Sequence, residues 1–131
     1  MFTERELELQ EVYSIRAWLI GFSNRVEPLT EEGRKVVYRF GRQFKQLRPF
    51  ALELETAMAD LRVKHGIFKD GKFVVLHESK ELLSAWEKDV DAISKKKVKA
   101  PFLSNKLTEA NLTDDLSGIK VSDGDFLEYF T

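Results

Sequence analysis

The sequence contains no cysteine, only three prolines and only two histidines, His65 and His77. The lack of cysteine excludes disulfide bonds, thiolate nucleophiles and cysteine-ligated zinc, and it leaves the redox compartment open. No stretch of 18 apolar residues is present, so we expect no membrane-spanning helix and no membrane partner. Residues 1–11 are rich in glutamate and lack a basic start followed by an apolar run, so no secretory signal is expected.

An excess of charge of one sign is also lacking. The 131 residues include 21 basic and 22 acidic ones, which gives a formal net charge of −1. A molecule with this balance has no strong overall field to attract nucleic acid or acidic lipid, so any such interaction must come from local patches. The length fits one domain, which we expect to span residues 1–131.

Catalytic motifs are missing as well. The sequence has no glycine-rich phosphate loop and no serine in a nucleophile-elbow context. Across a β-hairpin, His65 and His77 could meet and Glu78 could complete a metal site, but two histidines without a third dedicated ligand favour ordinary surface or helix-end positions. We therefore expect no catalytic residue, no metal and no cofactor, and we predict that the protein is not an enzyme.

A regular apolar pattern predicts a first helix that begins at Thr3. The Thr3 hydroxyl is placed to cap the N–H of Glu6, and the Glu6 carboxylate to bond back to Thr3. Apolar residues then follow at spacings of three and four, at Val12, Ile15, Leu19, Phe22 and Val26. The Glu27-Pro28 pair is expected to end this helix, because proline disfavours helical geometry in the residue before it.

The stretch from Thr30 to Gly66 keeps one apolar register for almost its whole length and predicts a long second helix. Its stripe consists of Val37, Phe40, Phe44, Leu47, Ala51, Leu54, Met58 and Leu61. Pro49 lies opposite this stripe, so we expect a bend with the proline on the outer side rather than a break. Gly66 is expected to close the helix in the left-handed conformation. The short connection to the first helix makes residues 3–66 a long antiparallel helical hairpin.

Shorter elements are expected beyond this hairpin. Residues 67–76 form a small β-hairpin, because the Asp70-Gly71 pair tolerates the positive φ angles of a two-residue turn. A third helix over residues 79–97 carries one apolar face. Residues 100–131 are too apolar for a disordered tail and form a packed, partly irregular C-terminal segment. The predicted fold class is therefore mainly α.

Two basic clusters are candidates for binding a polyanion. The first lies on the side of the second helix away from its apolar stripe and consists of Arg39, Arg42 and Lys45. The second lies at the end of the third helix and consists of Lys95, Lys96 and Lys97. Either cluster could follow a phosphate backbone or meet an acidic partner. We favour the simpler interpretation of a solvated helix face and of lysines that prefer the negative end of a helix dipole.

Several apolar side chains lie partly off the stripes that a simple helical hairpin would bury. They are Trp18, Ile20, Phe22, Tyr38 and Phe50. One interpretation is that they pack against the third helix. The other is that they form an interface in a homo-oligomer or a larger protein assembly, since exposed aromatic patches mark interfaces and the chain has ten phenylalanines. Both interpretations stay open at this point.

The order of these elements resembles that of small tailed-bacteriophage proteins of unknown function that contain a helical hairpin. The matching residues are Lys64-His65-Gly66, Asp70-Gly71, Phe73-Val74-Val75, Leu82-Leu83, and the tail from Leu116-Ser117-Gly118-Ile119 to Phe126-Leu127. His65 stands where a tyrosine is expected. The resemblance implies a phage or prophage origin, and it implies no catalytic residue because the set has none assigned.

The favoured function is that of a non-enzymatic phage or prophage accessory protein. It would act through protein–protein contacts as an assembly or virion component, in the cytoplasm, in the host cell cytoplasm if viral, or in the virion. The alternative is a small binding module that inhibits or recruits a host factor, or binds nucleic acid, through the two basic clusters. Nucleic acid is the less favoured partner.

Overall fold

The described part of the chain is mainly helical and has three small antiparallel sheets. The computed structural model describes residues 1–75 and 80–131. In these residues the helices are α1 Leu9–Arg25, α2 Glu31–Gln46, α3 Arg48–His65, α4 Lys80–Ser94, α5 Glu109–Thr113 and α6 Gly124–Leu127, with 3-10 turns at Val121–Asp123 and Glu128–Phe130. The strands are β1 Phe2–Glu8, β2 Glu27–Pro28, β3 Gly66–Lys69, β4 Lys72–Val75, β5 Lys97–Leu103 and β6 Leu116–Ser117. They pair as β1 with β5, β2 with β6 and β3 with β4.

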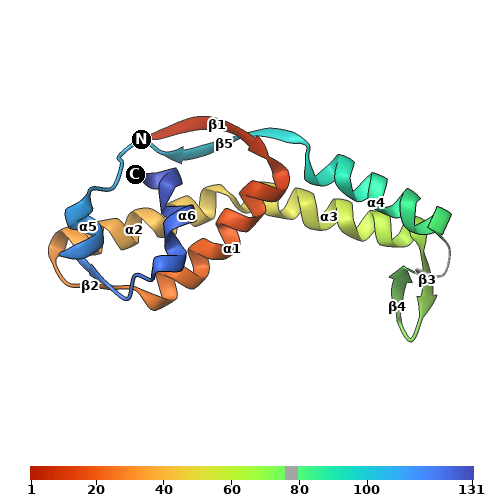
Figure 1. Cartoon of the computed structure of the whole chain (residues 1–131), viewed down its shortest axis with the longest axis horizontal. Coiled ribbons are helices and arrows are strands. Elements are labelled where there is room, and N and C mark those ends of the chain that lie inside the picture. Colours follow the sequence, from red (N-terminus) through yellow and green to blue (C-terminus); the bar gives the residue numbers. More distant parts are fainter. Residues whose placement is uncertain (76–79) are drawn as a thin grey trace.

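The molecule consists of a body and an arm (Figure 1). We define the body as residues 1–54 and 95–131, and the arm as residues 55–75 and 80–94. In the body, α1 runs antiparallel to α2, and the β1–β5 ribbon and the C-terminal helices lie against this pair. α3 leads out of the body, α4 runs back beside it, and the β3–β4 hairpin lies at the far end of the arm.

Residues 2–8 form a strand rather than the expected start of the first helix. β1 pairs antiparallel with β5 in a register that sets Glu8 opposite Lys97. α1 begins only after this strand, where the Glu8 N–H donates to the Glu11 carboxylate at 3.1 Å. The helix start predicted at Thr3 is wrong, because a local capping pattern cannot reveal a partner strand that comes from the other end of the sequence.

The second helix is interrupted at Leu47, where its path bends. Leu47 has φ −89° and ψ −6°, and it ends α2 and precedes α3. Pro49 lies in the first turn of α3, where a missing N–H is tolerated, and it is exposed. The outward position of the proline is confirmed. The bend expected in the long second helix is present, but the structure divides the expected helix into α2 and α3 at Leu47.

Gly66 joins α3 to β3 in an extended conformation, with φ −103° and ψ 173°. The left-handed closure predicted for it is therefore wrong. Glycine is needed for another reason, because a Cβ atom here would collide with the carbonyl oxygens of Arg62 and Val74. The turn at Asp70 and Gly71 has the predicted positive φ angles, 52° and 79°. The small β-hairpin is confirmed over its described residues.

The third helix, α4, ends at Ser94, three residues before the predicted end of the helix over residues 79–97. Lys97 instead begins β5, and the Lys96 carbonyl accepts a hydrogen bond from the N–H of Leu9 at 2.8 Å. Pairing with the N-terminal strand therefore ends this helix early. Residues 76–79, which the predicted hairpin and helix include, lie outside the described residues.

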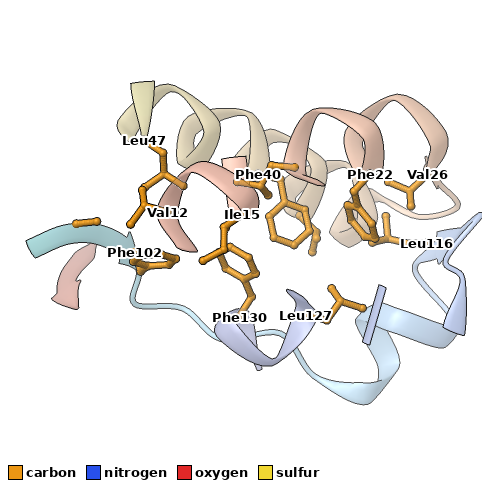
Figure 2. Packing of buried hydrophobic residues seen from close by; sticks show 13 residues of the cluster. Val12, Ile15, Phe22, Val26, Phe40, Leu47, Phe102, Leu116, Leu127 and Phe130 are labelled. Carbon is orange, nitrogen blue, oxygen red and sulfur yellow. The ribbon is translucent and has the colours of Figure 1, made fainter. Parts of the chain in front are cut away.

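The core lies in the body, between α1, α2, β5 and the C-terminal segment (Figure 2). The five stripe residues predicted on the first helix are all buried. On the second stripe the buried residues are Phe40, Leu47, Ala51 and Leu54, and the half-buried ones are Val37, Phe44, Met58 and Leu61. Phe40 meets Phe22 and Phe130 edge to face, with ring centroids 5.2 Å apart in both pairs. The buried face of α1 was thus located correctly from the apolar spacing. On α2 the buried residues are Gly33, Val36, Phe40 and Gln43, so the predicted stripe was off by one residue at Val37 and Phe44.

Gln43 is a buried polar residue of α2 that binds the free edge of β5. Its side-chain N–H donates to the Pro101 carbonyl at 2.8 Å, and its carbonyl oxygen accepts from the Leu103 N–H at 2.8 Å. The amide therefore satisfies two backbone groups that a third strand would otherwise pair with. This contact fixes the ribbon on α2.

The C-terminal segment packs across the body as a largely irregular chain. Residues 100–103 belong to β5, which the sequence did not indicate. Beyond them, Leu116, Leu127 and Phe130 are buried in the core. The predicted packed, partly irregular segment is confirmed, and it covers the side of α1 that the third helix was expected to cover.

Candidate interaction surfaces

The five predicted interface candidates divide into core and surface residues. Phe22 is fully buried, so its choice as an interface residue is wrong: no partner reaches it in the folded chain. Trp18 and Phe50 are half-buried and pack against the core. Ile20 and Tyr38 are exposed, with 50% and 69% of their surface accessible. Only the last two are thus available on the body surface.

Trp18 is held by the C-terminal segment rather than by the third helix. Its ring stacks on Phe126, with centroids 5.2 Å apart and planes 8° from parallel. Its indole N–H donates to the Asp123 carboxylate at 3.0 Å. The side chain therefore has both its apolar and its polar requirements met inside the fold.

Asp123 is a buried carboxylate that ties the C-terminal segment to α1. Arg25 donates two hydrogen bonds to it, at 2.6 and 2.9 Å, and the Lys120 backbone N–H donates a third at 2.7 Å. Burial alone would raise the pKa of Asp123, but the bonds from Arg25, Lys120 and Trp18 outweigh burial and lower the pKa to about 2. Both carboxylate oxygens already have donors, so this group serves the fold.

The first predicted basic cluster lies on the outer surface of α2. Lys45 is exposed, and Arg39 and Arg42 are half-exposed. The Arg39 Nε–H bonds weakly to the Lys35 carbonyl at 3.4 Å, and the Arg42 guanidinium lies 5.5 Å from the centre of the Phe2 ring. Among the described residues none of these three cations has an ion-pair partner. This side of α2 therefore keeps its positive charge.

The second predicted basic cluster is paired with acidic residues. Lys95 contacts Asp91 at 3.1 Å, and Lys96 contacts Glu53 at 2.5 Å. The third lysine of the cluster lies opposite Glu8 in the β1–β5 register. These carboxylates reduce the field that a polyanion would meet, so the two basic clusters differ in their surroundings.

A group of exposed apolar side chains lies on the arm, where the sequence did not suggest an interface. It consists of Val63, Ile67, Phe68, Phe73 and Leu82. Phe68 and Phe73 face each other across the β3–β4 hairpin, with ring centroids 5.4 Å apart. Phe68 keeps 67% of its surface accessible. Every arm residue whose exposure the structure describes is exposed or half-buried.

His65 lies at the end of α3 and contacts α4. Its Nε2 atom is 2.7 Å from the Asp89 carboxylate, and the Lys64 Nζ atom is 2.8 Å from the same oxygen. Lys64 and His65 together hold the pKa of Asp89 below its ordinary value. The alternative metal site also needs His77 and Glu78, which lie outside the described residues. Among the residues that are described, no group of three His, Asp or Glu side chains is placed to hold a metal ion.

Two features of the structure were not predicted from the sequence. The exposure of apolar side chains on the β3–β4 hairpin could have been predicted. Ile67 and Phe68 are consecutive strand residues, so their side chains point to opposite faces of the hairpin, and one helix cannot cover both. The pairing of Arg25 with Asp123 could not have been predicted, because nothing in the sequence links two charges 98 positions apart.

The chain matches no protein-family model, no curated protein and no solved structure. Within the two described stretches, no helix is long and apolar enough to cross a membrane. What the chain does must therefore be inferred from its own surfaces.

Proposed function

We propose that the chain is a non-enzymatic phage or prophage accessory protein that acts through protein–protein contacts as an assembly or virion component. Its arm docks onto a second copy of the chain. The phage setting rests only on the order of residues that resembles small tailed-bacteriophage proteins. The protein–protein contact rests on one observation. The arm exposes a group of large apolar side chains, and none of its residues whose exposure the structure describes is buried.

An arm of this construction leaves much apolar surface in water. The apolar face of α4 consists of Leu83, Trp86, Val90 and Ile93, and all four are only half-buried because α3 is the main element beside them. Full burial of a large apolar side chain is worth about 1.5–3 kcal/mol. The rings of Phe68 and Phe73 on the β3–β4 hairpin are even more exposed. A partner that covers the arm therefore gains binding energy from apolar groups that the isolated chain leaves in water.

We take the partner of the arm to be a second copy of the same chain. Most soluble oligomers are built from identical chains with closed symmetry. Interface cores are rich in aromatic residues, which the Phe68–Phe73 pair supplies. Lys69 and Lys72 lie opposite each other beside this pair, so salt screens their repulsion and the apolar contact is expected to persist at high salt.

The test is the mass in solution, measured by light scattering behind a sizing column at low and high salt. The expected result is a discrete multimer at both salt concentrations. Replacement of both hairpin aromatics, Phe68→Ser with Phe73→Ser, is expected to give a monomer of 15.2 kDa. A wild-type chain that elutes as a monomer at both salt concentrations would disprove the self-association.

Tyr38→Ser is the matched control. Tyr38 is as exposed as Phe68, but it lies on α2 in the body. The control variant is expected to keep the mass of the wild-type multimer. If Tyr38→Ser dissociates the multimer and the hairpin variant does not, the contact lies on the body and the role proposed for the arm is wrong.

A second candidate function is binding of nucleic acid by α2. The observation that favours it is the outer surface of this helix, where Arg39, Arg42 and Lys45 lack ion-pair partners among the described residues. Phosphate contacts of this kind make affinity fall steeply with salt. Retention on an immobilised polyanion that is lost in Arg39→Gln with Arg42→Gln, but kept in Lys95→Gln with Lys96→Gln, would support this alternative over assembly.

A further inference from the structure

A hollow of about 500 Å³ lies where α2 bends into α3, on the side that faces α1. We call it the bend hollow. Its lining comes from three helices and consists of Arg16, Phe44, Lys45, Arg48, Ala51, Leu52 and Glu55. The interruption at Leu47 creates it, because the last turn of α2 and the first turns of α3 contribute side chains to one wall. Its volume falls within the range of small-molecule sites.

Arg16 is the residue of the bend hollow whose polar groups are least satisfied. Its Nε atom is buried and has no hydrogen-bond partner among the described residues. Its guanidinium lies over the Phe44 ring, with the central carbon 4.1 Å from the ring centre. The ring holds the guanidinium in place but accepts no conventional hydrogen bond, so donor capacity remains for another group.

Two other arginines of the body that lie over aromatic rings have oxygen acceptors. Arg25 bonds to the Asp123 carboxylate, and Arg5 donates to the Tyr129 carbonyl in addition to lying over aromatic rings. Arg16 has a ring contact of the same kind but no acceptor among the described residues. An anion in the hollow would accept from the terminal N–H groups of Arg16, because the Nε atom itself has no exposed surface.

The charge of the lining favours an anion. Arg16, Lys45 and Arg48 are three cations, and none of them has an ion-pair partner in the described part of the chain. Glu55 is the one carboxylate on the lining, which leaves an excess of two positive charges. The remaining wall is apolar and is formed by an aromatic ring and two aliphatic side chains.

We propose that the bend hollow binds a small organic anion. Its phosphate or carboxylate group lies among Arg16, Lys45 and Arg48, and its apolar part lies against Phe44 and Leu52. Planar guanidinium groups suit both kinds of anion, because they bind two oxygens at once. Apart from Glu55 the lining lies in the body, and it includes none of the exposed apolar residues of the arm, so the site does not depend on the assembly proposed above.

Phenyl phosphate is the compound for the test, since it joins an anion to a ring of suitable size. We would titrate it into the full-length chain and follow heat by calorimetry and the backbone amides by NMR. Saturable binding with shifts centred on residues 44–55 is expected. Benzamide, which has the ring without the charge, and inorganic phosphate, which has the charge without the ring, are both expected to bind at least about tenfold more weakly.

Variants of the lining locate the binding. Arg16→Met is expected to weaken phenyl phosphate binding by about tenfold or more, the effect of one charge-assisted hydrogen bond. Glu55→Gln is expected to strengthen it by about two- to fivefold, because a nearby like charge is removed. Arg5→Met is the control, since Arg5 also lies over aromatic rings but outside the hollow.

Three outcomes would overturn the proposal. The first is the absence of saturable binding by the wild-type chain. The second is unchanged affinity in Arg16→Met, provided that its NMR spectrum shows a folded chain. The third is equal affinity for inorganic phosphate and phenyl phosphate, because the apolar wall would then contribute nothing. None of these results affects the mass measurement that tests assembly.

Discussion

The body and the arm are built from the same kinds of element, yet only the body has a core. Both contain a pair of antiparallel helices and a two-stranded ribbon. In the body the helix pair is covered by the β1–β5 ribbon and by the C-terminal segment, whereas in the arm α3 and α4 mainly cover each other (Figure 1). Every buried hydrophobic residue of the described chain lies in the body. Stable burial therefore follows from the number of layers, not from the amphipathic pattern alone.

The comparison also shows what an apolar stripe in a sequence means. The stripes of α1 and α4 look alike in spacing, but the first is fully buried and the second only half-buried. A stripe predicts which face of a helix avoids water. It does not say whether the covering element comes from the same chain, and the arm is where this uncertainty matters for function.

The largest loss of stability is expected when an aromatic ring is removed from the core of the body. Phe40→Ala deletes the ring that contacts Trp18, Phe22 and Phe130, and we expect the free energy of unfolding to fall by about 3–5 kcal/mol. Urea denaturation followed by tryptophan fluorescence measures it. A loss below about 1 kcal/mol would mean that the body is not tightly packed around Phe40.

A smaller effect is expected from the carboxylate that joins the C-terminal segment to α1. Asp123→Asn removes a charge whose pKa is lowered from 3.8 to about 2, which corresponds to about 2 kcal/mol of stability at neutral pH. Since the pKa is lower in the folded chain, this contribution is complete above about pH 4 and is lost as pH falls through about 2. The difference between wild type and variant in urea melts at pH 7 and near pH 2 tests it. A difference that stays constant over this range would contradict the charge-based explanation.

The smallest effect is expected in the arm. Phe68→Ala removes a ring that is mostly in water, so the unfolding free energy of the isolated chain changes by less than about 0.5 kcal/mol. The measurement is a urea melt at a concentration low enough to keep the chain monomeric. The same substitution is expected to weaken self-association at higher concentration. A large loss of monomer stability would show that the hairpin is packed within one chain.

The helices and the turn were predictable because they depend on local rules. The spacing of Val12, Ile15 and Leu19 located the buried face of α1, and the Asp70-Gly71 pair located the turn between β3 and β4. Errors arose where a distant segment overrode a local preference. Strand β1, the early end of α4 and the strand at residues 97–103 all follow from one long-range pairing.

The candidate surfaces were less predictable than the fold. Phe22 was a poor choice as an interface residue, because the three-four spacing had already placed it on the apolar stripe of the first helix, which is buried. The bend hollow was not foreseen either, since Arg16 and Phe44 meet only after α1 packs beside the bend. Pro49 did signal that the helix path changes near this point. The sequence did not indicate which side chains line the bend hollow.

The outward and returning course of the arm also bears on the order in which the chain folds. Trp18 bonds to Asp123, 105 positions later, and β1 pairs with β5 across a similar separation. Closing a long flexible loop costs entropy that grows with its length. The contacts of α3 with α4 and of β3 with β4 are local, so we expect them to form first. Once they form, the arm brings the chain back to where it left the body, and the loop that β1 and β5 must close becomes shorter.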